Sequence, residues 1–185
     1  MANLNSLKKY VNYRFSSGGV IGEDFKSFST KLRNYIKAIC EENGFEMVSY
    51  NRGHYESSGF IKNPKTNQFA YWSISDVRFW QNEWFDHVLY RMTDSEKDYR
   101  GKQNMYCSLE NLGQSISNMF ERYVVYNINN KEFSRSKMME VGRDVASLWG
   151  GECLDFEVDN DKQVVTFKCI EHGEFFITEQ AFAEF

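Results

Sequence analysis

Side chains that could perform catalysis are few in this chain, and their spacing matches no common catalytic motif. Only three histidines occur, at positions 54, 87 and 172, and no Gly-x-Ser-x-Gly sequence marks a hydrolase nucleophile. A nucleophilic hydrolase needs a general base beside its nucleophile. The only acid-x-Lys pair, Asp24 with Lys26, has no acid upstream to complete the metal site of a restriction-type nuclease. Neither class of enzyme is therefore expected.

Phosphate-binding loops and paired catalytic carboxylates give no better support for an enzyme. The glycines of Gly18 to Gly22 open a helical pattern, but Glu23 and Asp24 follow them and would repel a phosphate. Glu83 and Asp86 lie three residues apart, and acids so close together on a turn are usually only solvated. The sequence predicts a protein that is not an enzyme.

Cysteine and histidine spacing predicts no metal and no cofactor. The four cysteines, at positions 40, 107, 153 and 169, are scattered and form no Cys-x-x-Cys pair. Cys169 and His172 with Cys153 upstream would still need a fourth ligand to hold zinc. We expect four reduced thiols that serve as small apolar side chains.

The stretch YWSISDVRFWQNEWF, Tyr71 to Phe85, concentrates six aromatic rings in fifteen positions. With catalysis excluded, the rings form either a packed core or a surface that binds a partner. Strand alternation puts Phe69, Tyr71 and Ser73 on one face of a strand and Ala70, Trp72 and Ile74 on the other. We expect Trp72, Trp80 and Phe85 to lie mostly in the core, and we expect Trp84 and Arg78 to be exposed.

Basic residues follow this aromatic stretch closely. Bases interleaved with aromatic rings suit a nucleic-acid or ribonucleoprotein surface, through phosphate neutralisation and base stacking. The acids Asp94, Glu96 and Asp98 dilute the pattern. The predicted partner-binding residues of this region are Arg78, Trp80, Trp84, Arg91, Lys97, Arg100 and Lys102.

Hydrophobic periodicity predicts an α+β fold. Apolar residues recur at three- and four-residue steps between Glu23 and Asn43, which indicates an amphipathic helix that Gly44 ends. Four strand-like runs follow, and a second helix is expected from Ser108 to Tyr123. The predicted strands are 45–51, 54–63, 68–75 and 87–92. The first helix should pack on this antiparallel meander, with Phe28, Leu32, Ile36, Trp72 and Ile74 buried.

The remainder of the chain predicts a small, acidic α+β module. Ser134 can cap a helix that runs to Trp149, and 153–159 and 162–170 can pair as a hairpin, with a third strand at 173–177. We place the domains at 1–125 and 126–185. Residues 150–185 carry a net charge of −7 and residues 1–149 a net charge of +3. Along the first strand of the hairpin, Asp155, Glu157 and Asp159 alternate onto one face, where they are expected to meet a basic partner.

The broad class of the protein follows from composition. A share of 42% hydrophobic and 17% aromatic residues, with one proline, excludes a disordered chain. No apolar run approaches the length of a membrane span, and the first fifteen residues lack the apolar segment of a signal peptide. The sequence therefore predicts a cytoplasmic protein that does not contact a membrane.

Several segments together resemble one known family. LNSLKKYV, GGVIGEDFKSF, HYESSGFIKN, YWSISDVRFWQNEWFDHVLYRM and EKDYRGKQN are similar to small proteins carried on plasmids and integrative elements of Firmicutes. Some members of that family are anti-CRISPR proteins, which inhibit the RNA-guided DNA-cleaving effector of type II systems. The resemblance covers about residues 4–120, and the chain after Tyr123 has no counterpart in it.

The resemblance implies a non-enzymatic inhibitor whose partner is the type II effector nuclease with its guide RNA, and DNA is a further candidate partner. Such an inhibitor evades the defence that this effector provides. An effector of this type holds nucleic acid in a positively charged channel, which an acidic module can enter by imitating phosphates. Two alternatives remain open: a nucleic-acid-binding accessory or regulatory protein of a mobile element, and a plain protein-interaction module. A homodimer is compatible with each of them.

Overall fold

The computed structural model describes residues 3–159, 161–171, 173–182 and 184–185. Within them the chain divides into two compact units, Met1–Phe120 and Glu121–Phe185, a division five residues before the boundary placed from the sequence. Helices and antiparallel strands occur in both units, so the predicted α+β class is confirmed. No helix in the described part of the chain is both long enough and apolar enough to cross a membrane.

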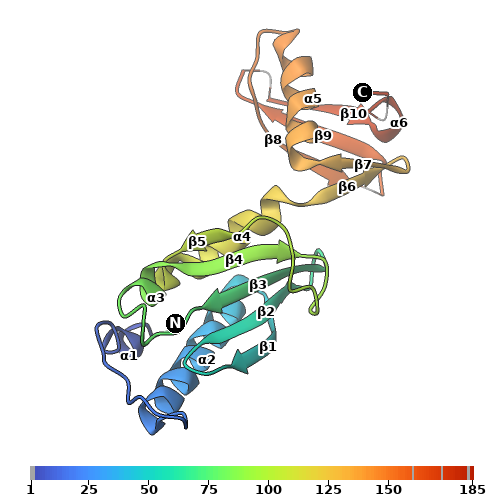
Figure 1. Ribbon diagram of the computed structural model, residues 1–185. Helices are drawn as coiled ribbons and strands as arrows, with labels where there is room; N and C mark the ends of the chain where they lie inside the picture. The colour runs from blue at the N-terminus through green and yellow to red at the C-terminus, as the bar shows by residue number, and fades with distance from the viewer. Residues whose placement is uncertain (1–2, 160, 172, 183) are drawn as a thin grey trace. The chain divides into compact units, whose positions relative to one another are not determined.

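The first unit is a five-stranded antiparallel sheet with its helices on one face (Figure 1). The strand order is β1-β2-β3-β4-β5, which is also the order along the chain. Two short helices, α1 (Asn5–Lys8) and α3 (Glu83–Asp86), and a 3₁₀ turn (Leu109–Asn111) accompany the two long ones. The strands are β1 (Glu46–Arg52), β2 (Ser57–Asn63), β3 (Gln68–Ile74), β4 (Val88–Thr93) and β5 (Met105–Cys107), and the long helices are α2 (Glu23–Asn43) and α4 (Leu112–Arg122).

Helix α2 has the bounds that the sequence predicts, for the predicted reasons. Glu23 and Asp24 lie in its first turn, where carboxylates favour the positive end of the helix dipole. Gly44 ends it with a left-handed backbone at φ 70°, a conformation that glycine adopts without strain.

The buried face of the sheet meets α2 and α4, and the five residues expected between the first helix and the meander are all buried. Phe28, Leu32, Ile36 and Trp72 are fully buried, and Ile74 is 1% exposed. Tyr50 ties β1 to α2, because its hydroxyl donates to the carbonyl oxygen of Ser29 at 2.9 Å. The predicted packing of the first helix on the meander is confirmed.

The second unit combines a two-stranded hairpin, a helix and a three-stranded sheet. The hairpin is β6 (Val125–Ile128) with β7 (Lys131–Ser134), and the sheet has the order β10-β9-β8. Ser134 caps α5 (Arg135–Ser147) by accepting from the backbone N–H of Lys137, as predicted. The remaining elements are β8 (Cys153–Asp159), β9 (Val164–Cys169), β10 (Gly173–Thr178) and α6 (Glu179–Phe182).

A single core holds the second unit together. Met138 and Val141 of α5 pack with Phe167 of the sheet, with Phe133 of the hairpin and with Phe182 of α6. Helix α5 can approach the sheet closely because Gly142 has no side chain: a Cβ there would lie 2.4 Å from the ring of Phe167. The expected pairing of 153–159 with 162–170 is confirmed as β8 with β9.

Candidate interaction surfaces

One face of the large sheet is turned away from α2 and α4 and carries basic side chains on aromatic rings. Strand pairing sets Phe60, Tyr71 and Arg91 in one row across β2, β3 and β4. The guanidinium of Arg91 lies over the ring of Tyr71, 4.7 Å from its centroid. One row away, the ammonium of Lys62 lies 5.5 Å from the ring centroid of Phe69. We call this surface, with Tyr106 of β5, the open face; the ring of Phe60 within it is fully buried.

The loop between β4 and β5, residues 94–104, extends the open face and has a defined conformation. The carboxylate of Asp98 accepts hydrogen bonds from the backbone N–H groups of Asp94, Arg100 and Gly101 at 2.9 to 3.1 Å. These bonds, that of Gly101 first, lower the pKa of Asp98 below its ordinary value. Tyr99 places its ring 5.2 Å from that of Phe60, centroid to centroid.

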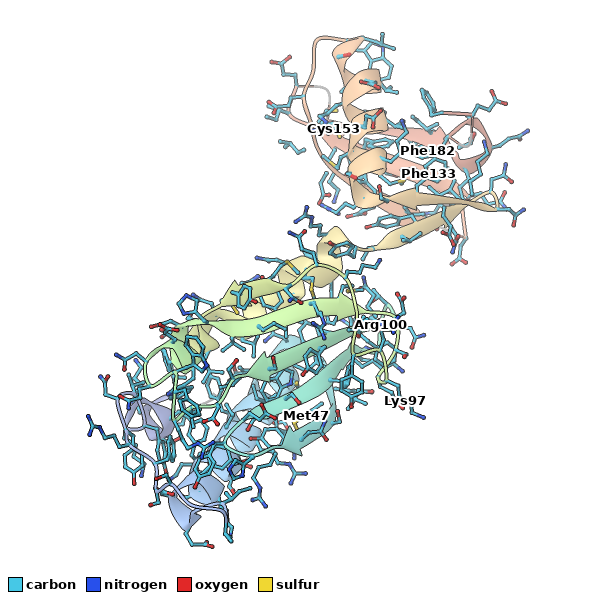
Figure 2. All side chains as sticks on the ribbon, in the orientation of Figure 1. Met47, Lys97, Arg100, Phe133, Cys153 and Phe182 are labelled. Carbon is cyan, nitrogen blue, oxygen red and sulfur yellow. The ribbon has the colours of Figure 1, made fainter. Side chains whose placement is uncertain are left out.

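The loop also presents three of the predicted basic residues. Lys97, Arg100 and Lys102 are all exposed, and Figure 2 shows Lys97 and Arg100 at the outer end of the loop. Arg91 has a different role from these three, because it donates to Asn104 Oδ1 at 2.9 Å and to the carbonyl of Tyr99. Arg91 therefore anchors the loop to the sheet as well as contributing charge to the open face.

Trp84 and Arg78 are less exposed than expected: Trp84 is buried, and Arg78 is partly buried, with 22% of its side chain exposed. Trp84 is only 2% exposed, because its ring packs edge-on against Phe28 of α2 at 5.0 Å. Arg78 forms a bidentate ion pair with Asp76, with its closest contact at 2.6 Å, and its guanidinium lies 4.2 Å from the ring centroid of Tyr55. Arg78 therefore stabilises the loop before α3.

Trp80 shows the opposite error, because it is half exposed and not mostly core. It lines a surface pocket of about 260 Å³ together with Ser75, Glu83, Trp84, His87 and Tyr106. Tyr106 is also more than half exposed. The exposed aromatic residues of this turn are therefore Phe79, which is 77% exposed, and Trp80, and not Trp84.

The Asp76–Arg78 pair predicts a pH-dependent part of the stability. Partial burial acts to raise the pKa of Asp76, but the hydrogen bonds from Arg78 outweigh it and lower that pKa below 3.8. A carboxyl with a lowered pKa in the folded state stabilises the fold above its unfolded pKa and stops doing so as pH falls through the folded value. Asp76→Asn should lower the melting temperature at pH 7, and the gap from wild type should shrink below about pH 4. Thermal melts between about pH 2.5 and pH 7 check this; a difference in melting temperature that does not change with pH would contradict it.

In the second unit, the three predicted acids lie along β8, and each one forms an ion pair. Asp155 contacts Arg135 at 2.8 Å, Glu157 contacts Lys168, and Asp159 contacts Lys162 at 3.0 Å. The hydrogen bond from Lys162 lowers the pKa of Asp159. Glu157 keeps 68% of its side chain exposed, the largest fraction of the three. It is therefore the acid best placed to meet a partner.

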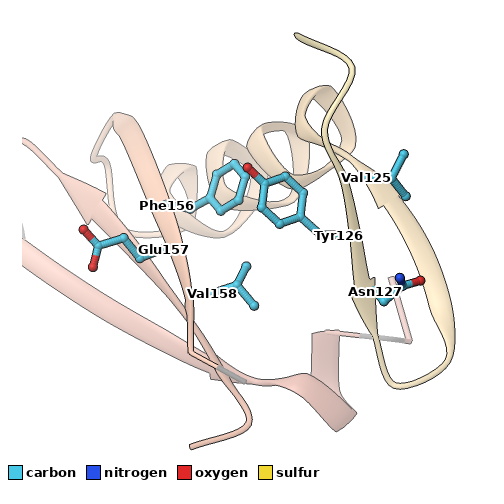
Figure 3. Close-up of a pocket in the computed structure, with 6 residues that line it drawn as sticks. All are labelled: Val125, Tyr126, Asn127, Phe156, Glu157 and Val158. Atoms are coloured by element: carbon cyan, nitrogen blue, oxygen red, sulfur yellow. The ribbon is translucent and has the colours of Figure 1, made fainter. Parts of the chain in front are cut away.

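A groove of about 680 Å³ lies beside these acids, between β6 and β8 (Figure 3). Val125, Tyr126 and Asn127 line it from β6, and Phe156, Glu157 and Val158 line it from β8. Sequence reasoning missed β6 and β7 and therefore missed this groove. The available signal was Asn129-Asn130, whose left-handed backbone angles of 49° and 62° suit a two-residue hairpin turn.

Three of the four cysteines are buried, as expected of small apolar side chains, and Cys107 is partly buried. Cys40, Cys153 and Cys169 are buried, and burial raises the pKa of Cys40 to about 12. His172 lies outside the described residues. Within those residues, no group of three or more His, Cys, Asp or Glu side chains could hold a metal ion.

Comparisons of the chain with protein families, with curated proteins and with solved structures found no match.

Proposed function

We propose that the protein is a non-enzymatic anti-CRISPR inhibitor that binds a type II effector nuclease with its guide RNA and blocks target DNA binding or cleavage. The observation that carries the proposal is the open face of the large sheet, where Lys62 and Arg91 lie over aromatic rings. An antiparallel sheet covered by helices on one side and carrying aromatic and basic residues on the other is a common platform for single-stranded nucleic acid. The resemblance of about residues 4–120 to inhibitors of this effector supports the choice of partner.

The charges of the two units fit a partner that contains both nucleic acid and a basic channel. The first unit carries a net charge of +2 and the second a net charge of −6. Long-range electrostatics would steer the first toward exposed guide RNA or DNA and the second toward the basic protein surface that holds them. The partner would then be a ribonucleoprotein, with protein and nucleic acid contacted together.

The test is a cleavage assay with a guide-loaded type II effector of a Firmicutes host and a labelled DNA target. A stoichiometric inhibitor should stop cleavage at about one molecule per effector, and the titration should show a sharp end point at that ratio. Lys97→Ala combined with Arg100→Ala should weaken inhibition, because both side chains are exposed beside the open face. If these side chains contact phosphate, the slope of the logarithm of the binding constant against the logarithm of the salt concentration should flatten by about 0.9 for each lost contact.

The matched control is Arg33→Ala with Lys37→Ala, which removes two exposed bases from α2 on the other side of the sheet. This control should inhibit like wild type. Equal loss in both double variants would assign the effect to net charge and not to the open face. Uninhibited cleavage at a large excess of wild-type protein would refute the proposal.

The runner-up function is a nucleic-acid-binding accessory protein that acts without any effector. The same open face favours it, so binding must be measured with duplex and single-stranded DNA alone. Tight, salt-sensitive binding to DNA with no effect on cleavage would select this alternative.

A further inference from the structure

The groove of the second unit is bounded on both sides by strands that each lack one neighbour. Strand β6 pairs with β7, and strand β8 pairs with β9; within the described residues neither has a second partner strand. Three consecutive residues of each strand line the groove, so the two unpaired edges border the same space (Figure 3). An unpaired edge presents a row of backbone N–H and C=O groups that can pair with an added strand.

The floor of the groove is aromatic and belongs to the core. The rings of Tyr126 and Phe156 meet edge-to-face with centroids 5.0 Å apart. Phe156 is 5% exposed, and Tyr126 and Val158 pack against the buried cluster. The guanidinium of Arg135 lies 5.2 Å from the ring centroid of Phe156, which helps to hold this ring in place. A strand laid over such a floor would bury every second side chain on it.

Of the described residues that line the groove, the one charged residue is an acid, Glu157. It remains largely exposed despite its contact with Lys168. Asp155 and Asp159 lie two residues away along the same strand, and the whole unit has a net charge of −6. An occupant whose outward side chains are basic would complement this charge, and an acidic occupant would be repelled.

We propose that the groove between β6 and β8 binds an extended basic segment of a partner protein, which pairs with both strand edges. The bound segment would join the hairpin and the three-stranded sheet through continuous backbone hydrogen bonds. Its alternate residues would be apolar toward Tyr126 and Phe156 and basic toward Glu157. This mode of recognition takes its affinity from main-chain pairing and its specificity from the alternating side chains. It concerns the second unit alone and does not require that the partner be a CRISPR effector.

The probe is a capped hexapeptide of alternating lysine and valine, added to the full-length protein. Amide hydrogen exchange and amide chemical shifts followed by NMR should both change at β6 and β8, with new protection of amides on both edges. Two N-methylated versions of the peptide test its two edges separately. One is methylated at the backbone amides of its three lysines, and the other at the backbone amides of its three valines. Each of these peptides should bind on the order of tenfold more weakly than the unmethylated one, because each loses its backbone hydrogen bonds to one of the two strand edges.

A pair of protein variants tests how much the charge of Glu157 contributes to peptide binding. Glu157→Gln should weaken binding roughly two- to fivefold, the range of an exposed ion pair. Glu174→Gln is the matched control, because Glu174 is exposed on β10, at the opposite edge of the same sheet. It should leave the affinity unchanged.

Four outcomes would overturn the inference. They are binding of either N-methylated peptide as tight as that of the unmethylated hexapeptide, protection at β10 in place of β6 and β8, no spectral change at about 1 mM probe, and preference for an alternating glutamate–valine peptide. Concentration-dependent protection of β6 and β8 without peptide would assign the groove to a second copy of the chain and would also overturn it. Each of these results is independent of the cleavage assay, so failure here leaves the proposed inhibition standing.

Discussion

Phe167→Ala is expected to unfold the second unit, residues 121–185, and to leave the first unit folded. Phe167 is fully buried, and the rings of Phe156, Phe175 and Phe182 surround it at centroid distances of 5.2 to 6.1 Å. Truncation of a buried phenylalanine to alanine costs about 3–5 kcal/mol. A unit of this small size has little stability in reserve, so a loss of this magnitude removes most of it.

The four tryptophans report on the two units separately. Trp149 lies in the second unit, and the tryptophans at positions 72, 80 and 84 lie in the first. In the variant, the indole N–H signal of Trp149 should move to its unfolded position in NMR spectra, and the other three should keep their native shifts.

The matched control for this prediction is Phe176→Ala, on the neighbouring strand β10. Phe176 is 72% exposed, so its removal should leave the thermal melt nearly unchanged. Collapse of all four indole signals in Phe167→Ala would show that the two units unfold as one. A native Trp149 signal would contradict the described core.

The long elements were predictable from sequence because their signals are local. Helix α2 follows from a repeating apolar face, two acids in the first turn and a glycine after the last. The β8–β9 pairing follows from two alternating runs separated by a short polar turn. Each of these features depends on residues close together in the chain, which is the information that a single sequence holds.

The exposure of single aromatic residues was not predictable, because it depends on distant packing. Trp80 and Trp84 have the same chemistry and lie on one turn, so the sequence cannot say which one is buried. Trp84 is the buried one because its ring packs against that of Phe28, which lies more than fifty residues earlier in the chain. The partial burial of Arg78 was not visible either, because its stacking partner, Tyr55, lies on a different loop.

The acidic strand shows how far local reasoning extends. Alternation of Asp155, Glu157 and Asp159 along β8 was visible in the sequence, and the strand exists. The ion pairs with Arg135 and Lys168 were not visible, because α5 and β9 supply them. The face is therefore less negative than its acids alone suggest, and its recognition potential is concentrated at Glu157 and the adjoining groove.

Ile36→Ala should destabilise the first unit by about 2–5 kcal/mol, because it deletes a fully buried side chain between α2 and the large sheet. Alanine has a higher helix propensity than isoleucine, so the loss comes from packing and not from the helix itself. Chemical denaturation should show a lower midpoint with an unchanged slope, since the surface exposed on unfolding stays nearly the same. Lys37→Ala is the matched control. Lys37 follows Ile36 in the sequence and its side chain is 64% exposed, so its removal should change stability by less than about 0.5 kcal/mol. Equal midpoints for Ile36→Ala and wild type would remove α2 from the core of the first unit, and the open face would lose the support that makes it a binding platform.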